Sequence, residues 1–262
     1  MCTVLLRLAP GSAWPLLVAA VRDEFLDRSW DPPAAHWPTH PSLVGGRDRT
    51  AGGTWLAVDP APSGRGSPAV AAVLNGVRLP PPPSGTRPSR GSLPLAAVAG
   101  TLPPTFEGYD GFHLLLGTAS TVEVWSWDGV SVVHHRLAAG DHIIVNDGVG
   151  AVSDPLVPHF APLLAALPDP PLAAATTEAA WGPWVDLLRG DGLALDDPRA
   201  LLIRHEFDGT QPDLAGRVYG SGSLALVGIA ADRVRYDFTA TPLTPHWAPV
   251  LPAPAPTPLH LC

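Results

Sequence analysis

The sequence predicts an α+β protein, and three observations support this prediction. Hydrophobic residues make up 46% of the 262-residue chain and charged residues only 15%, which is typical of a packed globular protein. Short apolar runs bounded by proline and glycine indicate strands near both ends of the chain, and the segment 155–189 carries helical spacing. Strand pairs followed by helices and then by further strands favour α+β over a regularly alternating α/β arrangement. We treat residues 1–262 as one domain.

The first 80 residues are predicted to be rich in strands. The runs CTVLLRLA (2–9) and WPLLVAAV (14–21) flank a Pro-Gly-Ser turn and predict a hairpin. The runs TWLAVDP (54–60) and PAVAAVLNGV (68–77) predict a second pair of strands. Between these pairs, proline and glycine punctuate the stretch 29–54, which we expect to be irregular.

The middle of the chain begins with a proline-rich segment, 79–91, that cannot hold a ladder or a helix and is expected to be an internal surface loop. SLPLAAVAG (92–100) then predicts a short helix. Three apolar runs over 111–146 predict an antiparallel meander with a tight turn at Asp128-Gly129.

The C-terminal part is predicted to contain two helices, then two strands, then an extended tail. The helices cover 155–167 and 176–189, where tryptophan and leucine recur at helical spacing. LALVGIA (224–230) and RVRYDFTA (233–240) read as a hairpin, and the tail 242–262 is rich in proline.

Composition and charge narrow the possible partners. The net charge is −8, all sixteen basic residues are arginine and no basic run occurs, which argues against a nucleic-acid partner. The longest apolar runs are far shorter than the roughly 20 residues of a membrane span, and the start lacks the pattern of a signal peptide. Two cysteines at opposite ends form neither a disulfide framework nor a metal pair. We therefore expect a cytoplasmic protein with no metal and no cofactor; the oligomeric state stays open.

Three motifs that could carry chemistry are weak here. GSGSLA (220–225) satisfies a dinucleotide fingerprint in letters, but the segment reads as a hairpin and not as a strand followed by a helix. His134 and His135 are adjacent strand residues that point to opposite faces, so they cannot easily share a metal. The G-x-S-x-G motif of serine hydrolases is absent from the sequence.

Cys2 is the stronger candidate because of its position. Once Met1 is removed, the thiol and the free α-amine of the chain belong to the same residue. An α-amine has a pKa of about 7.7–8.0 and can take the proton of a thiol, whose pKa is about 8.5. This is the logic of an N-terminal nucleophile. A cysteine at position 2 can also occur by chance.

Three ordered motifs follow Cys2 within the first 80 residues: AAVRDEFLDR (19–28), LVGGRDRTAGGTWLAVD (43–59) and AAVLNGVR (71–78). In this order and spacing the chain strongly resembles the transport and Golgi organisation protein 2 family, also called the NRDE family. The resemblance is weaker for SRG (89–91) and YDGFHLLLG (109–117) and faint beyond. It implies a fold similar to N-terminal nucleophile hydrolases: a four-layer αββα sandwich of two antiparallel sheets between helix layers.

The resemblance also implies roles for individual residues. Cys2 would be the nucleophile and its α-amine the base, with Arg22 beside the thiol. Asp23 or Glu24 would hold the amine; in a strand Arg22 and Glu24 share a face while Asp23 points away, so the choice stays open. Asn75 would donate to an oxyanion. The remaining implied residues are Asn146 as a second catalytic asparagine and Glu24, Trp55 and Arg78 as substrate contacts.

Three positions depart from the family pattern. Val21 replaces the asparagine of the NRDE motif, and Leu74 replaces a threonine. Gly222 stands where the family usually has an arginine, so a basic residue is missing here unless Arg217 takes its place. Two functions therefore remain. One is a cysteine hydrolase that cleaves the amide bond of a small molecule through an acyl-thioester. The alternative is a non-catalytic carrier of haem or an acyl-CoA-like lipid that uses the same pocket.

Overall fold

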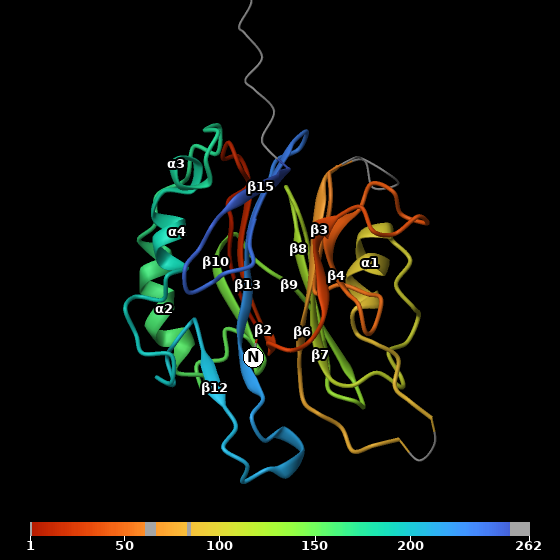
Figure 1. The fold of residues 1–262 in the computed structure, drawn as a ribbon. Helices are drawn as coiled ribbons and strands as arrows, with labels where there is room; N and C mark the ends of the chain where they lie inside the picture. Colours follow the sequence, from red (N-terminus) through yellow and green to blue (C-terminus); the bar gives the residue numbers. More distant parts are fainter. Residues whose placement is uncertain (1, 61–66, 83–84, 252–262) are drawn as a thin grey trace, which may run out of the picture.

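The computed structural model describes residues 2–60, 67–82 and 85–251 and has a mixed α+β fold with two antiparallel sheets (Figure 1). Within these residues the first sheet has eight strands. In spatial order they are β11 (Gly148–Val149), β10 (Gly140–Val145), β1 (Thr3–Leu8), β2 (Leu16–Phe25), β13 (Val218–Ile229), β14 (Val234–Thr239) and β15 (Ala248–Leu251), with β12 (Arg204–Glu206) also paired to β13. The predicted α+β class and the two antiparallel sheets are confirmed.

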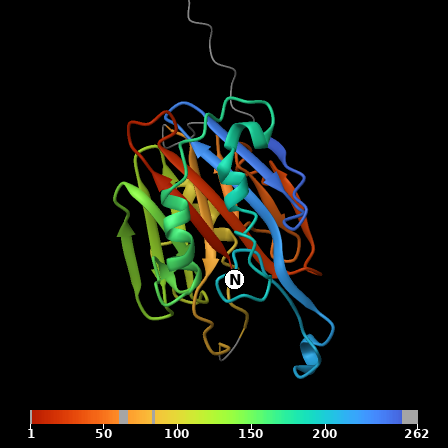
Figure 2. The ribbon, with the colours of Figure 1, turned by 90° about the vertical axis from the view of Figure 1, so that its left-hand side faces the viewer.

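The second sheet has seven strands in the order of the chain. They are β3 (Trp30–Ala34), β4 (Val44–Asp48), β5 (Leu56–Asp59), β6 (Ala69–Asn75), β7 (Phe112–Thr118), β8 (Val122–Trp127) and β9 (Val132–Arg136). Helix α1 (Ser92–Ala99) lies on the outer face of this sheet (Figure 1). Helices α2 (Leu156–Ala165), α3 (Thr177–Trp181) and α4 (Pro183–Leu187) cover the outer face of the first sheet, and Figure 2 views them lying across its strands.

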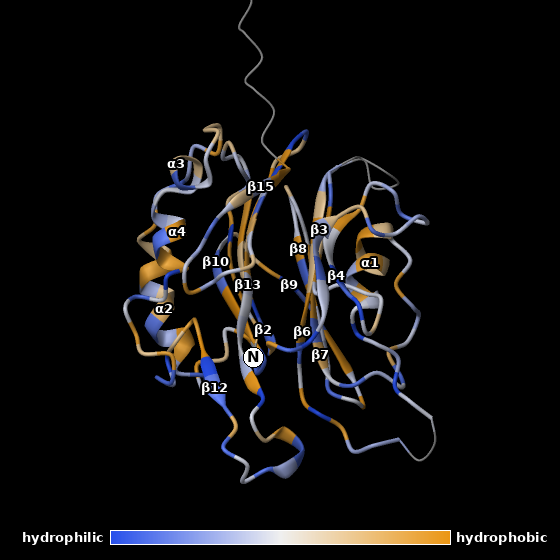
Figure 3. Cartoon of the chain, in the orientation of Figure 1, coloured by the Kyte–Doolittle hydropathy of each residue, from blue (hydrophilic) through white to orange (hydrophobic). Residues whose placement is uncertain are grey.

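Strand β2 shows how the sequence encodes this stacking. Its residues 16–23 are all buried, because the strand lies under helices on one face and under the second sheet on the other. Leu17, Ala19 and Val21 pack in the cluster beneath the helices, whereas Leu16, Val18 and Ala20 pack between the sheets. A third cluster fills the space between the second sheet and α1. Figure 3 shows the outlying β12 as a hydrophilic segment.

The predicted irregularity of 29–54 is wrong for two segments and confirmed for 35–43 and 49–54. This stretch contains β3 and β4, which pair with each other at the edge of the second sheet. Proline misled the prediction, because β3 contains Pro32 and Pro33 and an edge strand tolerates residues that cannot donate to a ladder.

Two further sequence predictions need correction. The meander over 111–146 breaks after β9: the chain passes to the other sheet, where β10 pairs with β1. The helix predicted over 176–189 is two short helices, because Gly182 has a positive φ of 51° and separates α3 from α4.

The proline-rich segments have little regular structure. The described part of 79–91 contains neither helix nor strand. In the predicted tail, Ala248–Leu251 forms β15 against β14, and residues 252–262 lie outside the described residues. Among the described helices, none has the length and apolarity needed to cross a bilayer.

Candidate active site

Most of the residues implied by the family resemblance meet at one end of the two sheets, near the start of the chain (Figure 1). Cys2 precedes β1, Arg22, Asp23 and Glu24 lie near the end of β2, and Asn75 is the last residue of β6. Together with Trp55, which precedes β5, they line a cavity of about 290 Å³ that we call the Cys2 pocket. The site therefore joins strand ends from both sheets.

Cys2 is half-buried and is held at both its backbone and its side chain. Its backbone N–H donates to Oδ1 of Asn146 at 2.9 Å, and its Sγ lies 3.7 Å from the backbone oxygen of Asp23. Burial raises the pKa of the Cys2 thiol, the negative charge of Asp23 raises it further, and the positive charge of Arg22 opposes these effects. In this structure the thiol is therefore protonated at neutral pH.

Asp23 is the buried carboxylate of the site, with 4% of its surface exposed. Its Oδ1 accepts a hydrogen bond from the Ser221 hydroxyl at 2.6 Å, across the β2–β13 pair. Burial raises the pKa of Asp23 to about 6, although the Ser221 hydrogen bond favours the charged form. Glu24 differs, because its carboxylate accepts the backbone N–H of Phe25 and lies 3.7 Å from Arg28.

Arg22 is 6% exposed and lies against two aromatic rings. Its Cζ is 4.4 Å from the centre of the Trp55 ring and 5.9 Å from that of Trp30. Within the part of the chain that the structure describes, no oxygen accepts a hydrogen bond from its guanidinium. Burial lowers the pKa of Arg22. The chain thus buries a cation whose hydrogen-bond donors are available to a ligand.

The position of Trp55 depends on a glycine in β4. A Cβ atom placed on Gly46 would lie 2.2 Å from the Trp55 ring, so only glycine leaves room for the ring against this strand. The rings of Trp55 and Trp30 meet edge to face with centres 5.6 Å apart.

Asn146 connects the start of the chain to a second polar group. Its backbone oxygen lies 2.9 Å from Nε2 of His113, whose Nδ1 lies 2.8 Å from the Ser126 hydroxyl. Because a carbonyl oxygen can only accept, Nε2 carries the proton, and burial lowers the pKa of His113. This neutral histidine therefore holds the loop that presents Asn146 to Cys2.

Sequence reasoning missed the charged wall of the pocket that the second sheet and its loops contribute. Arg28 pairs with Asp48 at 2.6 Å and Arg87 pairs with Asp110 at 3.1 Å. Arg90 donates to the backbone oxygen of Gly111 at 2.8 Å, and burial lowers its pKa. The motif GG-R-D and the weaker resemblance around SRG were the signals available for Asp48 and Arg90.

Other implied residues lie elsewhere. Arg78 is exposed and is not among the residues that line the Cys2 pocket. Arg217 forms a two-point ion pair with Asp27 and lies over the Phe25 ring, so it does not replace an arginine at position 222. In the described residues, no group of three or more His, Cys, Asp or Glu side chains is arranged to hold a metal ion.

Residues 1–154 match the model of the family described as Transport and Golgi organisation 2, which is more than half of the chain. The chain belongs to this family. A search of curated proteins finds no match. The matched part includes both Cys2 and Asn146, whereas Ser221 and Gly222 in β13 lie beyond it. The matched segment thus contains all the residues that line the Cys2 pocket, and β13 lies outside it.

Proposed function

We propose that this chain is an N-terminal cysteine hydrolase that cleaves the amide bond of a small molecule through an acyl-thioester. Two antiparallel sheets with helices on both outer faces support a fold like that of N-terminal nucleophile hydrolases. Fold alone does not determine activity, so the proposal depends on the site.

The observation that carries the proposal is the contact between the Cys2 nitrogen and Oδ1 of Asn146 at 2.9 Å. Removal of Met1 would turn this nitrogen into the α-amine of the chain, already oriented by an acceptor. The amine and the thiol would then share one residue at the edge of a pocket lined by Arg22, Asp23 and Asn75.

The reaction proceeds in two halves. The neutral amine takes the proton of the Cys2 thiol, and the thiolate attacks the carbonyl carbon of the amide. The oxyanion accepts a hydrogen bond from the side-chain amide of Asn75, a type of contact whose removal costs about 10²–10³ in kcat in other enzymes. The C–N bond then breaks, and the ammonium group returns its proton to the leaving amine. Water attacks the thioester, releases a carboxylic acid and restores the thiol.

The surrounding charges suit this chemistry. Arg22 is a buried cation beside the thiol and favours the thiolate once Met1 is gone. Asp23 is the better candidate to hold the new amine, because its charge acts directly on Cys2 whereas Glu24 is engaged by Phe25 and Arg28.

The test measures the mass and the thiol reactivity of the purified protein. A Cys262→Ser background leaves Cys2 as the only thiol. We expect the intact mass to lack methionine and iodoacetamide alkylation to rise with a midpoint below the pKa of about 8.5 of a free thiol. The matched control carries an N-terminal extension that keeps the Cys2 nitrogen in a peptide bond.

In that control the midpoint is expected above 8.5, because burial and Asp23 raise the pKa of the thiol. An Arg22→Met substitution in the processed protein should move the midpoint upward. Retention of Met1, or identical pH profiles of alkylation for the processed and extended chains, would contradict the proposal.

A second candidate function is a carrier of a hydrophobic ligand such as haem or an acyl-CoA-like lipid. The departures at Val21, Leu74 and Gly222 favour it, together with a largely apolar cavity beside Arg22. A Cys2→Ala chain that still copurifies with such a ligand, while the wild type shows no reactive thiol, would support this candidate.

A further inference from the structure

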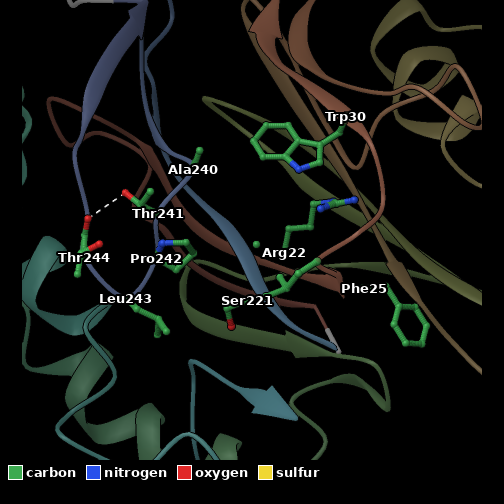
Figure 4. Close-up of a pocket in the computed structure, with 11 residues that line it drawn as sticks. Arg22, Phe25, Trp30, Ser221, Ala240, Thr241, Pro242, Leu243 and Thr244 are labelled. Carbon is green, nitrogen blue, oxygen red and sulfur yellow. Dashed lines mark hydrogen bonds between the residues drawn. The ribbon is translucent and has the colours of Figure 1, made fainter. Parts of the chain in front are cut away.

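A second cavity of about 350 Å³ opens on the other side of Arg22, between the end of β2, Trp30 and the loop 240–244 (Figure 4). We call it the Gly222 pocket. Arg22 lines both this pocket and the Cys2 pocket. The other walls of the Gly222 pocket are mainly apolar and consist of aromatic and aliphatic side chains: Phe25, Leu26, Trp30, Pro242 and Leu243.

The pocket exists because position 222 carries no side chain. Gly222 lies at a bulge, where the register between β2 and β13 shifts between Ser221 and Ser223. A Cβ atom at this position would lie 3.4 Å from Nη1 of Arg22 and 3.9 Å from Leu26. One atom fits at ordinary contact distances, and a longer side chain would fill the cavity.

The wall opposite Arg22 is held by its own hydrogen bonds. The Thr241 hydroxyl donates to the backbone oxygen of Thr244 at 2.9 Å, drawn as a dashed line in Figure 4. The backbone N–H groups of Thr241 and His246 both lie 3.2 Å from the Thr239 hydroxyl oxygen. Leu243 is nevertheless 49% exposed and Leu26 is 44% exposed. An ordered loop therefore presents apolar surface to the pocket without covering it.

The charge of the pocket comes from Arg22. Figure 4 shows its side chain between Trp30 and Ser221. Five N–H donors of a guanidinium with no acceptor among the described residues match the two oxygens of a carboxylate. The carboxylates whose charges interact with Arg22, those of Asp23, Glu24 and Asp48, do not line this pocket.

We propose that the Gly222 pocket binds a monocarboxylate with one compact aromatic or branched apolar group, whose carboxylate accepts hydrogen bonds from Arg22. The volume and the aromatic walls favour a compact group over a long chain. The link between this pocket and catalysis rests on the hydrolase activity proposed above. The bound acid is then the product of amide cleavage, held in the Gly222 pocket by Arg22, which also lines the Cys2 pocket.

The first experiment measures binding in a Cys2→Ala chain by isothermal titration calorimetry. The probes are 4-phenylbutyrate and its neutral analogue, 4-phenylbutyramide. We expect the carboxylate to bind about 10- to 100-fold more tightly than the amide, because hydrogen bonds to charged groups are worth more. In Arg22→Met this difference should vanish, while the amide keeps its affinity.

The second experiment blocks the cavity. Gly222→Leu should weaken 4-phenylbutyrate at least about tenfold, and Gly222→Ala should have a smaller effect, since its single added atom fits. Val133→Leu, in a separate cavity near His113, serves as the control and should leave affinity unchanged. Unchanged affinity in Gly222→Leu, or equal affinity of the two probes in the Arg22 protein, would overturn the proposal.

These outcomes are distinct from failure of the proposed hydrolase. Tight binding by Cys2→Ala together with an unreactive Cys2 in the processed protein would keep the pocket and exclude the enzyme. A reactive Cys2 with no selective binding of the carboxylate would support the enzyme and exclude the carboxylate pocket.

Discussion

Arg22 and Arg235 are the two buried arginines among the described residues, at 6% and 1% exposure, and both lie in the eight-stranded sheet. Nε and Nη2 of Arg235 donate to the two carboxylate oxygens of Asp237 at 2.6 and 3.0 Å. Nη1 donates to backbone oxygens of Leu172 and Ala174. Each nitrogen of this guanidinium thus has a partner from the chain.

Asp237 is equally well satisfied. It accepts the Thr177 hydroxyl and the Trp181 indole N–H, each at 2.7 Å, so the ion pair connects β14 to helix α3. A buried pair with complete hydrogen bonding defines how a helix docks on a sheet.

The guanidinium of Arg22 contacts aromatic rings, whereas that of Arg235 contacts oxygen atoms. Contact with a ring face offsets part of the cost of burying a cation, by about 2 kcal/mol when the contact is desolvated. The comparison teaches that burial alone does not identify a functional charge. The distinguishing feature is whether the chain itself supplies the acceptors.

The largest expected effect separates these two arginines by stability. Arg235→Met leaves Asp237 as a buried unpaired charge and should lower the free energy of unfolding by about 3–5 kcal/mol. Arg22→Met removes a cation that has no ion pair among the described residues, so the loss should be limited to its ring contacts, about 2 kcal/mol or less. Urea denaturation at neutral pH measures both. Equal losses would make Arg22 a structural residue and break the comparison.

A second prediction concerns the cost of keeping Asp23 charged beside Cys2. Its pKa rises on folding from 3.8 to about 6, so the native state binds the proton more tightly than the unfolded state. Stability from this group is therefore greatest below pH 3.8 and is lost as the pH rises through about 6. Asp23→Asn should raise the free energy of unfolding by about 3 kcal/mol at pH 7.5 and change it little at pH 3.5.

Asp27→Asn is the control for this pH dependence. Asp27 is exposed, and its hydrogen bonds to Arg217 lower its pKa, so its stabilising effect is present at neutral pH and lost on acidification. The two variants should therefore respond to pH with opposite signs. A stability gain of Asp23→Asn that is the same at both pH values would show that the burial of its charge is not the cause.

The sequence predicted the fold where local pattern and tertiary environment agree. Continuous apolar runs gave β1, β2, β6 and β13–β14, because these strands are buried on both faces. Where glycine and proline carry the signal, the prediction failed: Gly45 and Gly46 in β4 are needed for close approach to β5 and Trp55, not for a loop. The passage of the chain from β9 to β10 across the sheets has no local signature.

The same limit applies to the site. The family motifs pointed to Cys2, Arg22, Asp23 and Asn75, and the structure places all four around one cavity, although their catalytic roles stay predictions. The charged wall around Arg87 and Asp110 could not be derived, because its residues reach the pocket only through the pairing of the second sheet. In the sequence, Gly222 stood out because the family usually has an arginine there. The open cavity beside it could not be predicted, because it depends on how β2, β13 and the loop 240–244 pack.

The smallest expected effect compares the two sides of the Arg22 side chain. On the Trp55 side, Gly46→Ala puts a methyl group 2.2 Å from the ring. The ring must shift from its present place against Arg22, and the free energy of unfolding should fall by about 1–3 kcal/mol. On the other side, Gly222→Ala adds a methyl group at 3.4 Å or more from its neighbours and should cost less than about 1 kcal/mol.

Both glycines lie in strands without a positive φ, so the difference between the two variants reports the space around Arg22 and not backbone strain. Urea denaturation of the pair gives this difference directly. If Gly222→Ala proves as costly as Gly46→Ala, the cavity beside Arg22 is closed in solution and the guanidinium is enclosed on both sides. If only Gly46→Ala is costly, one face of Arg22 is fixed by Trp55 and the other is open to a ligand, which is the asymmetry that Arg235 lacks.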